Sequence, residues 1–150
     1  MITNNTYTIY TDGGCRGNPG KGGWGFHMIK PDKEILEKKG FDKKTTNNIM
    51  ELTAAIEGLM NIPDNSNVVL YTDSSYVKNG INSWINNWVK NGWKTANGKP
   101  VKNKLYWITL YNLTKKHNIE FKWVKAHANI YGNERADALA NEAMDEIKLK

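Results

Sequence analysis

The sequence predicts an α/β fold in which helices flank both faces of a five-stranded mixed sheet. The first observation is a run of three strand patterns whose connections are too short for crossover helices, which predicts an antiparallel meander. The second is the alternation of helical and strand patterns that follows, an order typical of parallel strands. The third is size, because 150 residues, 39% hydrophobic and 24% charged, suffice for one domain with a substantial core.

The first three strands are indicated by alternation and by turn residues. Threonines alternate with larger side chains over Tyr7–Asp12, which predicts a strand that ends at Asp12. The glycine-rich run Gly13–Gly20 is expected to turn. Two more strands are predicted over Gly22–Met28 and Glu34–Phe41, joined through a Pro-Asp turn.

A helix is expected next, capped by Thr45 or Thr46 and stopped by Pro63. Glu51 falls at the edge of its apolar arc, where the carboxylate is either partly desolvated and in need of a cation or an ordinary boundary residue. The apolar positions that share one side are Ile49, Leu52, Ile56, Leu59 and Met60.

The second half alternates strands and helices. The short apolar run Val68–Thr72 is typical of a buried parallel strand. A helix over Ser74–Val89 is expected to be interrupted near Gly80. The remaining elements, in order, are an exposed loop, a helix, a strand and a last helix: Asn91–Asn103, Leu105–Lys116, Ile119–Lys125 and Glu134–Ile147.

The charge distribution favours an anionic partner. The net charge is +6, and the stretch between Asp73 and Glu120 contains no carboxylate but many lysines and four of the six tryptophans. Arginine occurs only at Arg16 and Arg135. Because lysine neutralises phosphate as a point charge, this composition favours binding to a nucleic-acid backbone over reading of bases. A solvated basic surface is the alternative.

The composition also excludes several classes of protein. The first ten residues carry no secretory signal, and the composition argues against a membrane span. The one cysteine, Cys15, cannot form an internal disulfide, so we expect a cytoplasmic protein. Zinc lacks ligands, and the glycine run fits neither a phosphate-binding Walker A loop nor a Rossmann fingerprint. The sequence contains no Gly-x-Ser-x-Gly elbow, so nothing in it indicates a serine hydrolase of that type.

Dispersed acids are the candidates for chemistry. Asp12 and Asp73 each follow a strand, and neighbouring strand ends would bring them together, although either one alone is as readily a turn former or a helix cap. Asp137 is expected in the first turn of the last helix, where negative charge is favoured, one turn after Glu134. His127 precedes a short loop, either as a proton shuttle or as a surface residue. Oxygen ligands favour Mg²⁺ or Mn²⁺.

Four motifs occur in order along the chain: Thr11–Gly14, Thr45–Asn48 with Met50–Leu52, Tyr71–Ser74, and Val124–Ala128 with Asn133–Asp137. Together they resemble type 1 ribonuclease H, and the resemblance extends from about residue 6 to 146 of a single domain spanning 1–150. The chain is similar to the stand-alone bacterial type. The resemblance implies a ribonuclease H-like fold and an endonuclease, expected to be a monomer, that hydrolyses the RNA strand of RNA–DNA hybrids. It implies 5′-phosphate and 3′-hydroxyl products and no strong sequence specificity.

The same resemblance implies roles for individual residues. Four carboxylates would hold two Mg²⁺ ions, with Mn²⁺ as a substitute: Asp12, Glu51, Asp73 and Asp137. His127 would assist proton transfer or product release, and Glu134 would assist metal exchange. The residues implied to contact the hybrid are Gly13, Gly14, Asn18, Lys44, Thr46, Asn47, Asn48, Ser75, Trp84, Trp88, Lys90, Trp93, Lys94, Lys102 and Asn103.

The chain departs at two places from the pattern of the family that it resembles. Close bacterial members often carry a dense basic cluster that is thinner here, at Val89, Lys90 and Asn91, and Ser75 stands where they often place a longer amide. Two alternatives remain open from the sequence: another metal nuclease on the same fold, and a nucleic-acid binding module without activity.

Overall fold

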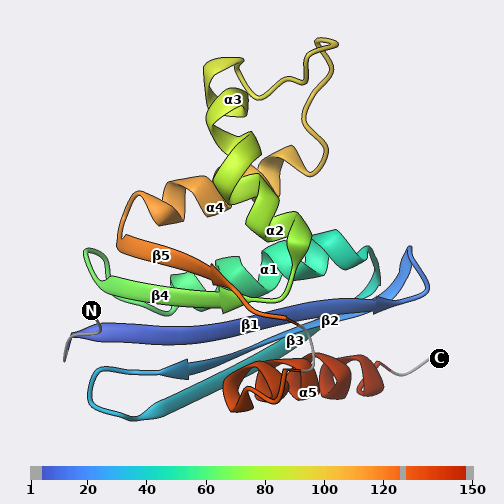
Figure 1. Ribbon diagram of the computed structural model, residues 1–150. Helices are drawn as coiled ribbons and strands as arrows, with labels where there is room; N and C mark the ends of the chain where they lie inside the picture. The colour runs from blue at the N-terminus through green and yellow to red at the C-terminus, as the bar shows by residue number, and fades with distance from the viewer. Residues whose placement is uncertain (1–4, 126–127, 148–150) are drawn as a thin grey trace.

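The computed structural model describes residues 5–125 and 128–147. Its centre is a five-stranded sheet in the order β3-β2-β1-β4-β5 (Figure 1). β2 pairs antiparallel with β1 and β3, whereas β4 is parallel to β1 and β5, which confirms the predicted mixed sheet. The strands are β1 (Thr6–Arg16), β2 (Gly20–Ile29), β3 (Ile35–Thr45), β4 (Asn67–Thr72) and β5 (Asn118–Trp123).

Helices cover both faces of the sheet, as predicted. α1 (Asn47–Met60) and α4 (Lys104–Thr114) lie on one face, and α5 (Tyr131–Asp145) lies on the other (Figure 1). Between β4 and α4 the chain rises away from the sheet as α2 (Ser75–Asn79), the π-helical turn η1 (Gly80–Trp84), α3 (Ile85–Lys90) and a loop over residues 91–103. We call residues 75–103 the handle. Among the described helices, none is both long and apolar enough to span a bilayer.

The hydrophobic core lies between the sheet and the layer of α1 and α4. Alternate strand residues point into it, and the helices contribute one apolar side each. Burial of these side chains supplies most of the free energy that holds the two layers together. Its fully buried members include Ile9, Phe26, Leu52, Leu59, Leu70, Trp107 and Leu110.

β1 is longer than the sequence predicted. The strand does not end at Asp12 but continues to Arg16, and only residues 17–19 form the turn. Gly13, one of the glycines that suggested a turn, instead serves close packing, because a Cβ atom there would lie 2.3 Å from the backbone of Met50 in α1. Asp12 therefore lies inside a paired strand, opposite Gly25 of β2.

α1 begins where expected, and Leu52, Ile56 and Leu59 are buried as predicted. Thr46 is its N-cap, and its Oγ1 accepts a hydrogen bond from the Ile49 N–H at 3.2 Å. The predicted inward position of Met60 is wrong, since this side chain is 62% exposed. The helix ends there, and Ile62, beyond the Asn61 cap, occupies the buried position instead.

The second half confirms one helix prediction and corrects another. The helix that starts at Ser75 is interrupted at Gly80 as predicted, because α2 ends at Asn79 and the chain widens there into the π-turn η1. α5 begins at Tyr131 and not at Glu134, because Gly132, which suggested a loop, packs as a buried helical residue. Asp137 therefore lies in the second turn of α5, and the prediction that placed it in the first turn is wrong.

Candidate active site

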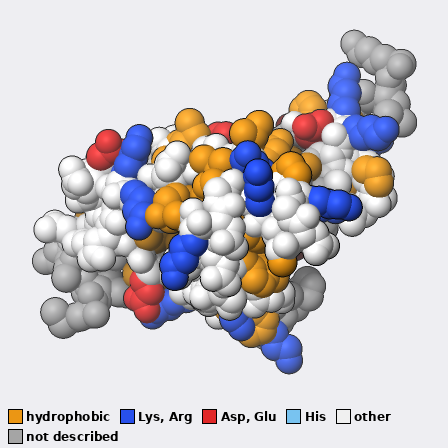
Figure 2. Space-filling view, turned by 90° about the horizontal axis from the view of Figure 1, so that it is seen from above, with side chains coloured by type: hydrophobic (Ala, Val, Ile, Leu, Met, Phe, Trp, Pro, Cys, Tyr) orange, Lys and Arg blue, Asp and Glu red, His pale blue; other side chains and the backbone are white. Residues whose placement is uncertain are grey.

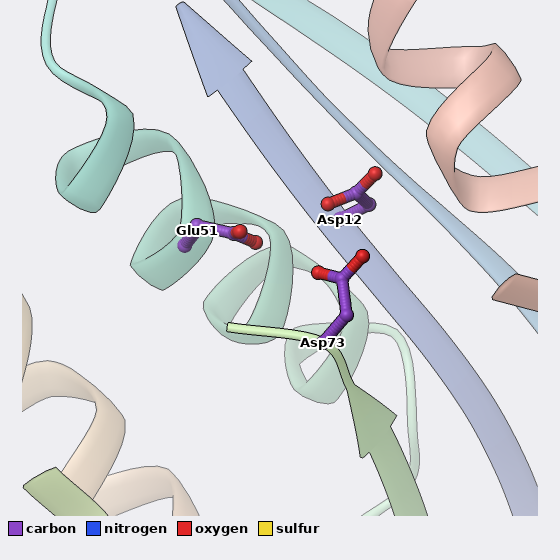
Figure 3. Close-up of side chains that lie close together, drawn as sticks. All are labelled: Asp12, Glu51 and Asp73. Carbon is purple, nitrogen blue, oxygen red and sulfur yellow. The ribbon is translucent and has the colours of Figure 1, made fainter. Parts of the chain in front are cut away.

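Three carboxylates from separate elements converge at the edge of the sheet. Asp12 comes from β1, Glu51 from α1, and Asp73 from the connection between β4 and α2 (Figure 3). Each offers one oxygen atom, and these three atoms lie within 4.8 Å of one another. Asp12 and Glu51 are buried, with 6% and 8% of their surface exposed.

Strand register and helix packing explain this convergence. β1 and β4 are parallel neighbours with Thr11 opposite Thr72. The residues that follow these two threonines, Asp12 and Asp73, therefore lie on the same side of the sheet as each other. α1 crosses β1 in direct contact at Gly13, which brings the second turn of the helix and Glu51 over Asp12.

A fourth carboxylate reaches the same site from α5. A hollow of about 230 Å³ opens beside the three acids. Asp137 interacts with Asp12 closely enough to raise the pKa of the Asp12 carboxyl. The hollow is lined by Asp12, Gly13, Glu51, Asp73, Asn133, Glu134 and Asp137. The structure thus brings together all four acids singled out in the sequence, with Glu134 beside them.

The acids repel one another strongly. The pKa of Asp12 is raised to about 10, by burial as the largest cause and then by the neighbouring Glu51, Asp73 and Asp137. Burial and Asp73 also raise the pKa of Glu51 well above its usual range, although a hydrogen bond from the Gly13 backbone partly offsets the shift. The Gly13 N–H donates to Asp12 Oδ1 at 3.0 Å. Fixed acids with raised pKa values are typical of a site that holds cations.

The residues present fit a hard divalent cation. The donor atoms that converge are carboxylate oxygens, the ligands that Mg²⁺ and Mn²⁺ prefer. Glu51 Oε1 is buried and has no hydrogen-bond partner among the described residues, as expected of an atom that would bind an ion. Asn133 Oδ1, which lines the same hollow, is buried and unpartnered within the same part of the chain.

Asn133 is the residue that sequence reasoning missed. It is 3% exposed and belongs to the first turn of α5. The signal was present, because Asn133 directly precedes Glu134 in the last motif. His127, singled out for proton transfer, lies outside the described residues.

A second hollow continues from the acids along β1. It has a volume of about 210 Å³ and runs between the end of β1, the start of α1 and the last turns of α5. Gly13, Gly14 and Asn47 line it, three of the residues implied to contact the hybrid. Asn18, in the turn after β1, accepts a hydrogen bond from the Asn47 N–H at 3.1 Å, which joins it to this group.

Other residues implied to contact the hybrid come from separate elements. Lys44 is exposed near the end of β3, and the Thr46 hydroxyl is already engaged in capping α1. Asn48 is half-buried in the first turn of α1, and Ser75 is exposed at the start of α2. Asn103 has a left-handed backbone, with φ of 60°, and its amide donates to the Tyr76 hydroxyl at 3.1 Å.

The handle combines an aromatic base with exposed lysines. The Trp84 and Trp88 rings lie 5.8 Å apart and the Trp88 and Trp93 rings 6.3 Å apart, centroid to centroid. Trp88 and Trp93 pack against the core, so they fix the handle to the body. Its exposed cationic side chains include Lys90, Lys94 and Lys102. Figure 2 shows lysine and arginine side chains distributed among hydrophobic ones over the face that carries the handle.

Comparisons with known proteins agree on one family. A family model described as RNase H matches residues 4–145. The Ribonuclease H of Hydrogenovibrio crunogenus is 54% identical over 139 residues, which cover 93% of this chain and 95% of the relative. The Ribonuclease H of Francisella philomiragia is 52% identical over 148 residues, or 97% of this chain and 95% of that one.

Solved structures give the same result. The crystal structure of LC9-RNase H1, described as a type 1 RNase H with the type 2 active-site motif, has a TM-score of 0.82 and 30% identity, and the alignment covers 97% of this chain and 74% of that one. LC11-RNase H1, solved in complex with an RNA/DNA hybrid, has a TM-score of 0.70 and 25% identity, with 93% of this chain and 97% of that chain covered.

Proposed function

The chain belongs to the RNase H family and is a ribonuclease H enzyme, and from this premise we propose that Asp12, Glu51, Asp73 and Asp137 carry its chemistry. Its reaction is the hydrolysis of the RNA strand of RNA–DNA hybrids. The observation that carries the residue assignment is the convergence of three carboxylate oxygens within 4.8 Å, with Asp137 facing the same hollow.

The proposed cofactor is a pair of Mg²⁺ ions, for which Mn²⁺ can substitute. Asp12 would contact both ions, Glu51 and Asp73 one of them, and Asp137 the other. When bound, the ions supply Lewis acidity that activates the attacking water and offsets the charge that develops on the phosphate. The products would carry 5′-phosphate and 3′-hydroxyl ends.

The chain's own residues prepare the site in three ways. β1, α1 and α5 hold the acids in place before substrate arrives, so little reorganisation is needed at the moment of reaction. Burial of Asp12 and Glu51 excludes bulk water from their oxygens, which strengthens their interaction with a cation. Glu134, on the rim of the same hollow, is proposed to assist exchange of the ions.

The hybrid is proposed to lie along the second hollow. Asn18, Asn47 and Asn48, with the Gly13–Gly14 backbone, would contact the 2′-hydroxyl side of the RNA strand across its wide minor groove. Thr46 and Asn103, with Lys44, would hold a phosphate of the DNA strand. The lysines of the handle would add attraction that weakens as salt concentration rises.

One digestion experiment tests reaction, substrate and cofactor together. End-labelled RNA–DNA hybrid is incubated with the protein with and without Mg²⁺, beside RNA duplex, DNA duplex and single strands. We expect cleavage of the RNA strand of the hybrid, and only with the cation. Comparable cleavage of a DNA duplex would instead favour another metal nuclease of this fold, and binding that ignores Mg²⁺ without cleavage would favour a binding module. A cytoplasmic location and a monomeric state stay predictions from the sequence.

A further inference from the structure

One row of side chains crosses the whole sheet just behind the acids. Strand pairing places one residue of each strand in register along this row. Because the β1 member lies two residues before Asp12, the row shares a face of the sheet with that carboxylate. From β3 to β5 the row consists of Glu37, His27, Tyr10, Tyr71 and Lys122.

Neighbours in the row contact one another. His27, 4% exposed, has its Nδ1 atom 2.6 Å from Glu37 Oε2. The Tyr10 and Tyr71 rings stack with centroids 4.7 Å apart and planes within 12°. The row is thus a packed surface with its negative charge at the β3 end.

The start of α5 is seated on this surface by three contacts. Arg135 binds Glu37 with both arms of its guanidinium, Nε to Oε2 and Nη2 to Oε1, each at 2.9 Å. The Tyr131 ring meets the His27 ring edge to face at 5.6 Å. A Cβ atom on Gly132 would lie 2.2 Å from the Tyr10 ring, so the helix backbone itself rests on the row.

The first turns of α5 contact the row with one side and line the active site with another. Asn133, Glu134 and Asp137 face the hollow beside the acids, whereas Tyr131, Gly132 and Arg135 face the row. Arg135 and Asp137 are separated by about 3 Å along the helix axis. A shift or rotation of this turn would therefore move the Asp137 carboxylate relative to Asp12.

We propose that Glu37, buttressed by His27, is a positioning residue that fixes the start of α5 through Arg135 and so sets the Asp137 carboxylate against Asp12. The inference rests on the proposed function, because it matters for catalysis only if Asp137 takes part. A displacement of about 1 Å in a reacting constellation costs on the order of a hundredfold in rate, so even a partial release of the helix is measurable.

The chain offers a matched control on the same strand and the same helix. Lys39, two residues after Glu37, forms ion pairs with Glu142 at 3.3 Å and with Glu146 at 2.6 Å. These pairs tie β3 to the far end of α5, beyond Asp137. A Lys39→Gln variant therefore removes a tie between the same two elements without touching the end that enters the site.

The experiment compares Glu37→Gln, Arg135→Lys and Lys39→Gln with the unchanged chain, well below the melting temperature of each. Arg135→Lys keeps the positive charge but loses the two-armed geometry, and it serves as the second variant if Glu37→Gln fails to fold. Three quantities are measured. The first two are kcat and KM for hybrid cleavage, and the third is the Mg²⁺ concentration at which the NMR shift of the Asp137 amide is half complete, without substrate.

We expect kcat to fall about tenfold in Glu37→Gln and Arg135→Lys, with KM within twofold and the Mg²⁺ midpoint at Asp137 raised severalfold. Lys39→Gln should leave all three within twofold. Three outcomes would overturn the proposal. The first is a loss of kcat in Lys39→Gln equal to that in the other two variants, the second is an unchanged kcat in both Glu37→Gln and Arg135→Lys, and the third is a loss of kcat in Glu37→Gln alone. If the unchanged chain fails to cleave the hybrid, the proposed function fails, and the amide titration still decides the positioning role.

Discussion

The fold raises the pKa of the active-site carboxyls but lowers that of another carboxyl near α5, Glu37. Asp12 and Glu51 are buried beside other acids, and burial and mutual repulsion raise their pKa values. Glu37, one row away, receives two hydrogen bonds from Arg135 and one contact from His27, and its pKa is lowered to about 2. Neighbouring acids that lack a cationic partner are typical of a cation-binding site. An acid whose charge is balanced by an arginine has a structural role.

The sharpest way to break this contrast is Asp12→Asn. The substitution removes the acid proposed to contact both ions, so we expect turnover to fall at least about a thousandfold. The native state should be no less stable, because an asparagine at this position neither carries a repelled charge nor has to take up a proton on folding. Hybrid cleavage and thermal unfolding measure the two effects. Asp32→Asn, an exposed aspartate in the β2–β3 turn, is the control, and near-normal turnover in Asp12→Asn would refute the assignment.

The second prediction concerns the cation itself. Mg²⁺ at about a hundred times its dissociation constant should raise the free energy of unfolding by about 2.7 kcal/mol, because it binds the folded chain and relieves the repulsion. Glu51→Gln should lose at least half of that gain. Glu57→Gln, on the α1 side that faces α4, should keep it. Thermal unfolding with chelator and with Mg²⁺ measures the gain, and an undiminished gain in Glu51→Gln would exclude Glu51 as a ligand.

The sequence predicts this contrast only in part. The order and type of the five strands followed from alternation and connection length, and the motifs brought Asp12, Glu51, Asp73 and Asp137 together as one hypothesis. Local patterns failed where glycines support close packing: Gly13 and Gly132 suggested loops, yet both lie in regular elements pressed against a neighbour.

The acid balanced by an arginine was not predictable from local sequence at all. Glu37 and Arg135 are 98 positions apart, and no motif links them. Their contact depends on the register of β3 against β2 and on the start of α5, which the sequence analysis placed three residues too late. Long-range pairing of this kind requires the tertiary arrangement, whereas the active-site acids were recognisable because each belongs to a local motif.

The third prediction uses pH. The folded pKa of Glu37, about 2, lies below its ordinary value of 4.5, so its contribution to stability is complete above about pH 4.5 and is lost as pH falls toward 2. Among the described residues, Arg135 and His27 are the charged or titratable groups that contact it. Because the pair is partly solvated, we expect a contribution of about 1–2 kcal/mol. Chemical unfolding between pH 2 and 7 measures it. Glu37→Gln should flatten this part of the profile, and Lys39→Gln should not; equal profiles for Glu37→Gln and the unchanged chain would contradict the assignment.

The smallest effect is expected at the opposite end of the cross-sheet row. Lys122 lies over the Tyr71 ring with its Nζ atom 6.0 Å from the ring centroid, and its side chain is exposed. A cation–π contact of this kind contributes about 0.5 kcal/mol, so Lys122→Gln should lower stability by no more than that and leave kcat within twofold. Lys125→Gln, an exposed lysine three residues later, controls for the loss of one positive charge in hybrid binding. A tenfold loss of kcat in Lys122→Gln alone would show that the Tyr10–Tyr71 stack, and not Glu37, determines the position of α5. The contact that positions the helix would then have to be reassigned from β3 to the centre of the sheet.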